Sequence, residues 1–423
     1  MRVDRSKAPE FNIPEDFELL PPEEFNLSNG AKFFYIPTPG IEAVKIEILC
    51  KGQRASLPLE QTLVPSFTLQ MLLEGTRQKN AGEIAEFFDF YASEVHPILT
   101  FSHEGLSLLS TKKHLATVVE LFISLFTQAI FPEDMLKKRQ SQRKLSIRLE
   151  REKTASRAGQ VFRKCLFGAS HPYGAEVTES HVDKITRSQL IAYYELMLWQ
   201  NLEIFVTGNF DAKELENLSI QFGYIPNRPI SEPVLLPGIN TLLAATEPRE
   251  KSVQSSIRIG SWSIPKTHPD FIALSIFNTI LGGYFGSRLI KNIREDKGHT
   301  YGIYSSLAEI GDSDYWVIAA DVQKAFYPSV IKEIYHEIQL LTQVEIDKDE
   351  LEVVRNYLIG QMLKQFSTSF DLSDRFKAVH HSGMDFDYYT EKLAYLKKFS
   401  SQDMLRIGQK YFSNPPFIEV VIG

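Results

Sequence analysis

The 423-residue chain has few cysteines, no excess of basic residues and no long apolar run. Its two cysteines, Cys50 and Cys165, are too few for a disulfide framework or a four-cysteine zinc site, so we expect two buried free thiols. The net charge of -7 disfavours nucleic acid as a partner, because phosphate binding requires a basic face. No run of about 18 apolar residues occurs, so we predict no transmembrane helix and no membrane partner.

The N-terminal segment lacks the apolar stretch that defines a signal peptide. The charged residues Arg2, Asp4 and Arg5 are followed by Lys7, Pro9 and Glu10, and no apolar stretch comes after them. We therefore expect a cytoplasmic protein, or a periplasmic one if a leader has been removed.

What the chain does have is the composition of a soluble globular protein, with 43% hydrophobic and 23% charged residues. Its length exceeds one ordinary core and suits two domains of about 200 residues. Four prolines within residues 226–238 predict an extended linker between them. We therefore predict one domain over residues 1–225 and a second over residues 239–423.

The two halves show similar patterns in the same order. Each is expected to contain a strand, an apolar helix, a hairpin and long amphipathic helices, near 43–49, 60–73, 94–110 and 115–165 in the first half and near 254–260, 269–281, 301–322 and 326–366 in the second. Each half then ends in a helix followed by a strand. This repetition predicts an α+β fold of two homologous domains, each an antiparallel sheet packed by helices, related by a pseudo-two-fold axis.

One segment of the second half, residues 281–304, carries candidate substrate-binding groups. A Gly-rich turn is followed by a short predicted helix from about Ser287 to Glu295 and by a strand that begins at Tyr301. Arg294 lies at the helix end, so it and Tyr301 can both point into one cleft. Arginine offers fixed donors for a carbonyl or carboxylate group, and tyrosine offers one hydroxyl donor. Such a pair suits a peptide backbone or a scissile carbonyl, although residue types alone favour a solvated helix end for Arg294.

This segment resembles the C-terminal domain of the pitrilysin/insulinase family of metallopeptidases. That family carries a Gly-rich turn, then an arginine, then a tyrosine seven residues later, which matches Arg294 and Tyr301. The resemblance covers nearly the whole chain and is to the short two-domain bacterial members related to mitochondrial processing peptidase. It implies that Arg294 and Tyr301 bind peptide substrate.

The family's inverted zinc motif, H-x-x-E-H, is absent. In the family this motif shortly precedes a Gly-Thr pair, which is Gly75-Thr76 here, so its three chemical positions hold Ser66, Leu69 and Gln70. Zinc needs imidazole or carboxylate ligands, and the motif's glutamate activates the bound water. These three residues supply none of those groups.

No other pattern of histidines predicts a metal site. The family's later glutamate ligand would fall near Ile147, where glutamates are close but a lone carboxylate makes no zinc site. His103 and His336 are each followed by a glutamate, yet neither has a second histidine four residues on. His380 and His381 are adjacent and are expected to face different directions on a helix. We therefore predict no metal and no cofactor in this chain.

Together these features predict a subunit that is inactive alone and contributes to a heteromeric zinc metallopeptidase. A homologous partner, in a heterodimer or larger assembly, would carry the zinc, and a homodimer is the alternative in isolation. Two rival functions are a structural scaffold of the same fold and a hydrolase with an unrelated site. The Arg294 and Tyr301 pair argues against the scaffold, and the lack of a nucleophile motif argues against the hydrolase.

Overall fold

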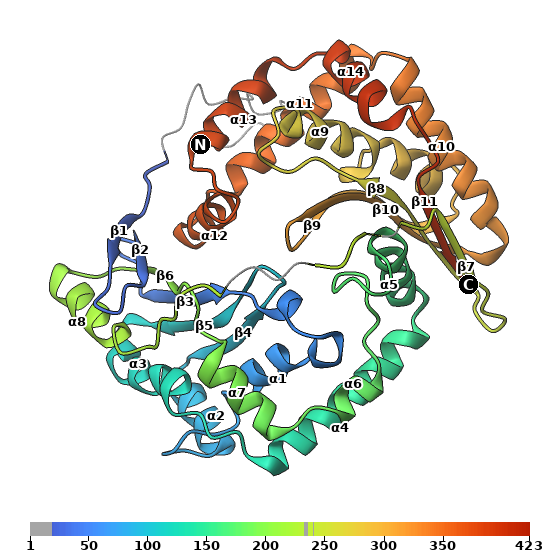
Figure 1. Cartoon of the computed structure of the whole chain (residues 1–423). Coiled ribbons are helices and arrows are strands. Elements are labelled where there is room, and N and C mark those ends of the chain that lie inside the picture. The colour runs from blue at the N-terminus through green and yellow to red at the C-terminus, as the bar shows by residue number, and fades with distance from the viewer. Residues whose placement is uncertain (1–18, 232–235, 240) are drawn as a thin grey trace, which may run out of the picture.

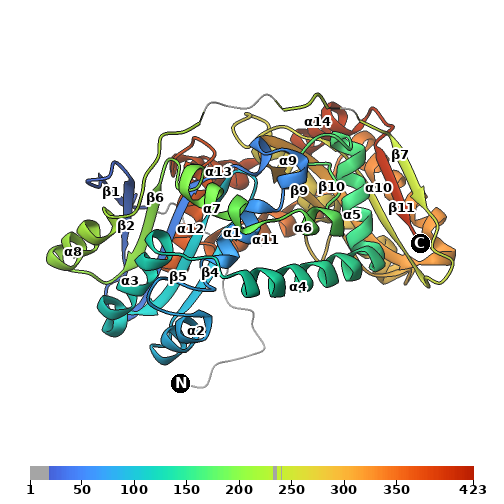
Figure 2. The same ribbon diagram turned by 60° about the horizontal axis from the view of Figure 1, so that its bottom comes forward.

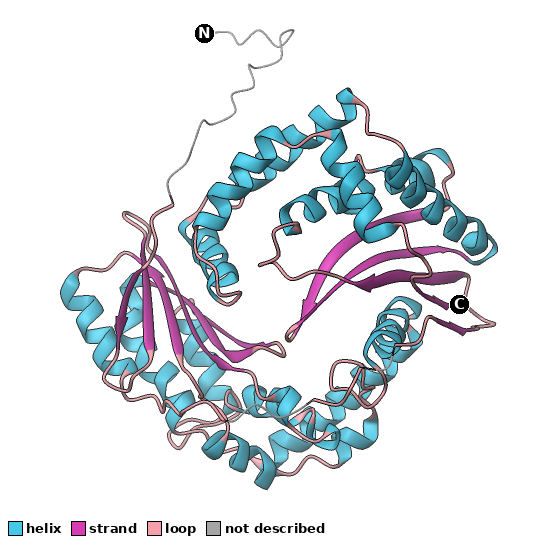
Figure 3. Ribbon diagram, turned by 45° about the horizontal axis from the view of Figure 1, so that its top comes forward, coloured by secondary structure: helices cyan, strands magenta, loops and turns pink. Residues whose placement is uncertain are grey.

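The computed structural model describes residues 19–231, 236–239 and 241–423, so residues 232–235 of the expected linker lie outside the described part. Two β-sheets line the inner side of a ring-shaped molecule, and most helices form its outer layer (Figures 1 and 3). Within the described residues, no helix has both the length and the apolar composition needed to cross a membrane. Cys50 and Cys165 are buried free thiols, as predicted.

The first sheet has six strands in the order β1-β2-β6-β3-β5-β4. Their bounds are β1 Glu23–Asn26, β2 Lys32–Pro37, β3 Ala43–Lys51, β4 Glu94–Leu99, β5 His103–Thr111 and β6 Glu203–Gly208. Neighbouring strands are antiparallel except β2 and β6, which are parallel. On β3, the alternate residues Val44, Ile46 and Ile48 are fully buried in the first core, on the face that the helices of this half cover.

The first half contains eight α-helices within the described residues. They are α1 Val64–Met71, α2 Ala81–Phe90, α3 Lys112–Thr127, α4 Glu133–Glu152, α5 Thr154–Phe167, α6 Glu179–Asp183, α7 Arg187–Leu196 and α8 Ala212–Phe222. Polar caps fix several of their starts; Asn80, Thr186 and Asp211 each accept a hydrogen bond from the backbone three residues on. Figure 2 shows α4 extending away from the first sheet toward α5.

The second sheet has five strands in the order β7-β11-β8-β10-β9. Their bounds are β7 Ala244–Glu247, β8 Gln254–Trp262, β9 Thr300–Ile310, β10 Ser313–Gln323 and β11 Ile418–Ile422. The helices are α9 Phe271–Asn278, α10 Tyr327–Gln343, α11 Lys348–Lys364, α12 Ser369–His380, α13 Asp387–Lys398 and α14 Ser401–Phe412. Two π-helical segments, Thr279–Gly283 and Ile290–Asp296, lie between α9 and β9.

The two sheets share one topology, which agrees with the repeat seen in the sequence. Strands β2-β6-β3-β5-β4 of the first sheet correspond in order to β7-β11-β8-β10-β9 of the second. The predicted α+β fold is confirmed, but the sheets are mixed and not wholly antiparallel. The reason is that the last strand of each sheet runs parallel to an early one, β6 beside β2 and β11 beside β7.

The halves also exchange helices. Helix α5 of the first half packs on β8 and β11 of the second sheet, and α12 of the second half packs on β2 and β6 of the first sheet. Figure 1 shows α12 inside the ring next to the first sheet, on the side opposite the helices that cover its other face. The inner faces of the two sheets therefore meet side chains from the other half.

Candidate functional site

Helix α1 carries the three positions of the missing zinc motif. Ser66, Leu69 and Gln70 are spaced so that they lie on one face of this helix. Leu69 is fully buried in the first core, and the Ser66 hydroxyl donates to the Leu63 carbonyl at 2.9 Å. An apolar, buried side chain stands where the family places its catalytic glutamate, so these residues do not fit a zinc ion.

The residues near the expected third zinc ligand, on α4, are also committed to structural contacts. Ile147 on α4 is buried in the first core. Glu150, one turn later, accepts hydrogen bonds from Arg143 at 2.8 Å and from the Ser146 hydroxyl at 2.7 Å. Burial would raise the pKa of Glu150, but these donors outweigh it and lower that pKa. This carboxylate is a structural partner of Arg143.

Arg294 and Tyr301 lie at the edge of the second sheet, in the order that the sequence predicted. Arg294 belongs to the π-helical segment Ile290–Asp296, which Gly298 follows with a φ of +64° that favours glycine. Tyr301 is the second residue of β9, the edge strand, and 91% of its surface is exposed. Its ring therefore contributes little to the core, and its exposure calls for another explanation than packing.

Two cations near Arg294 are paired with carboxylates, whereas Arg294 and Lys291 have no ion pair among the described residues. Arg288 holds Glu350 through two hydrogen bonds of 3.0 and 2.8 Å, and Lys297 pairs with Glu333. Arg294 is exposed and forms no ion pair with any residue that the structure describes. Its guanidinium lies 5.1 Å from the ring centre of Phe285, which is itself exposed.

A histidine and glutamate group that the sequence did not predict lies between the two halves. The Nε2 atoms of His380 and His381 lie 2.9 and 3.0 Å from the two carboxylate oxygens of Glu203, at the start of β6. The ring of His103, at the start of β5, stacks on His381 with centres 3.7 Å apart. The expectation that His380 and His381 diverge is wrong, because both rings reach the single carboxylate of Glu203 although the backbone stays helical through His381.

The electrostatics of this group follow from its burial. Burial alone would raise the pKa of Glu203, but hydrogen bonds from His380 and His381 lower it to about 2. Burial, with the nearby His381, lowers the pKa of His103 to about 4. At neutral pH Glu203 is therefore ionised and His103 is neutral.

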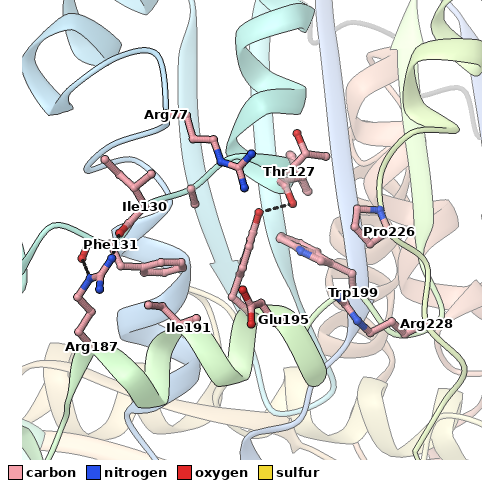
Figure 4. Close-up of a pocket in the computed structure, with 13 residues that line it drawn as sticks. Arg77, Thr127, Ile130, Phe131, Arg187, Ile191, Glu195, Trp199, Pro226 and Arg228 are labelled. Carbon is pink, nitrogen blue, oxygen red and sulfur yellow. Dashed lines mark hydrogen bonds between the residues drawn. The ribbon is translucent and has the colours of Figure 1, made fainter.

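A cavity of about 420 Å³ opens on the helical side of the first half, away from all of these residues (Figure 4). Arg77, Arg187 and Arg228 line it together with Trp199. Arg187 donates to the carbonyls of Ile130 and Phe131, and Arg228 donates to the Leu198 carbonyl. Two of the three arginines thus hold backbone in place.

Comparisons with known proteins agree with the resemblance seen in the sequence. The family described as the peptidase M16 inactive domain matches residues 184–358. "Uncharacterized zinc protease YmxG" of Bacillus subtilis is 22% identical over 356 residues, covering 83% of this chain and 86% of that protein. "Probable inactive metalloprotease YmfF" of the same organism is 20% identical over 256 residues, covering 56% and 57%.

The fold comparison covers almost the whole chain. The crystal structure of a peptidase M16 inactive domain from Pseudomonas fluorescens matches with a TM-score of 0.82 and 19% identity, over 95% of this chain and 98% of that one. The sequence matches extend over both halves, and the two mixed sheets packed by helices are those of that structure. Residues 184–358 thus resemble the M16 (pitrilysin) inactive domain in sequence, and the whole chain has the two-domain α+β fold of M16 structures.

Proposed function

We propose that this chain is a non-catalytic subunit of a heteromeric zinc metallopeptidase, which binds peptide through Arg294 and Tyr301 while a homologous partner carries the zinc. The observation that carries the proposal is the contrast at the second sheet's edge. Arg288 and Lys297 are tied to carboxylates, whereas Arg294 is exposed without an ion pair in the described residues and Tyr301 is 91% exposed.

The edge strand gives a physical route to peptide binding. In the described sheet β9 pairs only with β10, so its outer edge is open to an added strand. Backbone groups of β9 already engaged are the Ser305 carbonyl, bound by Asn278, and the Gly302 N–H and carbonyl, bound by the Thr300 hydroxyl. Tyr301 and Tyr304 are exposed along β9, and Phe285 is exposed beside Arg294. Main-chain hydrogen bonds would hold an extended peptide, and the Arg294 guanidinium would donate to a peptide carbonyl. The Tyr301 hydroxyl would give a second donor.

The division of labour follows from helix α1. With Ser66, Leu69 and Gln70 at the motif positions, this chain has no group on α1 that could ligate zinc or activate water. Zinc in the partner would supply the activated water. The role left to this chain is to bind and orient the substrate, and we expect the isolated chain to cleave no peptide.

The test is a complex reconstituted from this chain and a homologous subunit that carries H-x-x-E-H. Arg294→Ala and Tyr301→Phe should each lower peptide hydrolysis about ten- to a hundred-fold, the value of one lost charge-assisted hydrogen bond. Zinc content and assembly should not change. Lys291→Ala is the matched control, because Lys291 is an exposed cation of the same π-helical segment and should leave the rate unchanged.

The double variant separates substrate binding from indirect effects. Its loss should fall short of the product of the two single losses, because both groups hold one substrate segment. If both single variants retain the full rate in a complex of verified composition, the pair has no role in proteolysis. A scaffold of processing-peptidase-like fold then replaces the proposed subunit.

A further inference from the structure

We infer that this chain holds a zinc site of its own, formed by His103, Glu203 and His381, and that the bound ion fastens helix α12 to the first sheet. The three residues lie on β5, on β6 and just after α12. This site uses none of the residues of α1 and neither Arg294 nor Tyr301. It therefore does not rest on the proposed peptidase role.

The distances are compatible with one ion. One nitrogen from each histidine and one oxygen of Glu203 lie within 4.8 Å of one another. A point therefore exists that is at most about 2.8 Å from all three atoms, whereas zinc binds nitrogen and oxygen at about 2.0–2.2 Å. Side-chain rotations that move each atom by less than about 1 Å would close this gap.

The His103 ring must make the largest adjustment. It is now nearly parallel to His381, with an angle of 18° between the rings and centres 3.7 Å apart. A metal ion lies in the plane of each imidazole that binds it, so two rings stacked face to face cannot share one ion. Rotation of His103 about its Cβ–Cγ bond would bring a ring nitrogen toward Glu203 without moving the backbone of β5.

A fourth residue already orients the carboxylate. The Nε2 atom of His380 lies 2.9 Å from Oε1 of Glu203, while His381 contacts Oε2 at 3.0 Å. An ion bound at Oε2 in place of the His381 hydrogen bond would leave the His380 contact intact. Such outer partners of a ligating carboxylate typically hold its orientation and raise metal affinity.

The ligand types decide the class of metal. Two imidazole nitrogens and one carboxylate oxygen, with room for solvent at a further position, are typical of zinc and of its substitutes cobalt and nickel. Calcium and magnesium prefer sets made entirely of oxygen. Glu203 is largely buried and the two histidines are partly buried, so the group is shielded from solvent and is not an exposed charge cluster.

Zinc binding would link the two halves of the chain. His103 and Glu203 belong to the first sheet, whereas His381 follows a helix of the second half. An ion that binds all three joins the halves at the point where α12 crosses the sheet. Zinc should then stabilise the folded chain by mass action, by an amount that grows with the logarithm of the zinc concentration divided by its Kd.

The experiment titrates the metal-free full chain with zinc chloride by calorimetry and counts bound zinc by elemental analysis. We expect one zinc ion per chain. His103→Ala and His381→Ala should each lower the affinity at least about a hundred-fold, and His380→Ala about ten- to a hundred-fold. His96→Ala is the matched control, because His96 pairs with Glu94 at 3.2 Å in an exposed pair that has no third ligand among the described residues.

Two further measurements keep the test decisive. Zinc should raise the thermal unfolding midpoint of the native chain but not that of His381→Ala, and the visible spectrum of the cobalt-loaded chain should change in His103→Ala. If His381→Ala does not fold, His103→Asn tests the same site. Sub-stoichiometric binding, or an affinity that His103→Ala leaves unchanged, would overturn the inference. Arg294→Ala should leave zinc binding unaltered, so failure here and failure of the proposed function are distinct.

Discussion

Helices α5 and α12 occupy corresponding places in the two halves, yet they hold the opposite sheets by different chemistry. Each is followed by two more helices and the strand that runs parallel to an early one. The contact of α5 is made by fully buried apolar side chains, Phe162 and Leu166 on the helix and Val420 on β11. The contact of α12 combines a small apolar cluster with charged and histidine side chains.

The α5 contact depends on close packing. Gly260 on β8 leaves room for Phe162, because a Cβ atom there would come within 2.8 Å of the Phe162 ring and still closer to the Trp316 carbonyl. The hydrophobic effect is non-directional, and these apolar side chains do not titrate. We therefore expect the α5 contact to hold wherever the protein is folded.

The α12 contact depends on charge placement. Phe376 packs against Phe34 and Phe205, but beside it Lys377 lies between Glu47 of β3 and Asp374 of its own helix. Lys45 of β3 also pairs with Asp374, at 2.8 Å. Ion pairs are directional and respond to protons and bound ions. The comparison separates two kinds of joint between the halves. The α5 joint does not respond to protons or bound ions, whereas the α12 joint does.

The largest expected effect is at the apolar joint. Phe162→Ala should lower the free energy of unfolding by about 3–5 kcal/mol, because it opens a cavity in a closely packed contact. Phe376→Ala, at the matching place on α12, should cost about 1–2 kcal/mol, since this ring is only partly buried. Urea denaturation of both variants measures the difference. Equal losses would contradict the distinction between the two joints.

The sequence predicted much of the frame in which these joints sit. The repeated order of strands and helices, the placement of Ser66, Leu69 and Gln70 on one helix, and the position of Arg294 and Tyr301 at a helix and strand boundary all follow from local patterns. Periodicity and turn residues carry that information, because they act within a few residues of each other.

Local sequence patterns did not predict the contacts of α5 and α12 with the opposite sheets. The spacing of apolar residues in α5 and α12 shows which face is buried, but it does not show that the face meets the other half's sheet. Local patterns also did not predict the parallel strand pairs, because β2 and β6 are separated in sequence by most of a domain. His103, Glu203 and His381 come from three distant elements, so no spacing motif could have found them.

A smaller effect is expected from the cation at the centre of the α12 joint. Lys377→Met should cost about 1–3 kcal/mol, because it leaves the largely buried Glu47 with one fewer cation. The loss should stay below that of a fully orphaned buried charge, since Lys45 remains 3.3 Å from Glu47. Thermal or urea unfolding gives the measurement.

An exposed ion pair serves as the control for this variant. Arg148 and Glu179 form two hydrogen bonds on the surface of the first half, and Arg148→Met should cost less than about 1 kcal/mol. If Lys377→Met lowered the free energy of unfolding no more than Arg148→Met does, the ion pairs of α12 would not stabilise the α12 joint. Its stability would then come from the packing of Phe376 alone.

The smallest expected effect is a pH dependence confined to the α12 joint. Burial would raise the pKa of Asp374, but Lys377 and Lys45 outweigh it and lower that pKa. A lowered folded pKa means that the unfolded chain binds a proton first as the pH falls. The stabilisation is therefore complete above about pH 4, the unfolded value, and is lost as the pH falls through the lower folded value. It should amount to less than about 1 kcal/mol, because Asp374 is 43% exposed.

The measurement is the unfolding free energy at several pH values between 6 and 3. Asp374→Asn should be less stable than the native chain at pH 6, and the difference should shrink as the pH approaches 3. Phe162→Ala, in contrast, should lower the stability by a similar amount at both ends of this range, because no proton is involved in its contact. A difference between Asp374→Asn and the native chain that stayed constant down to pH 3 would show that the Asp374 charge does not stabilise the joint, and the two joints would then differ only in how closely they pack.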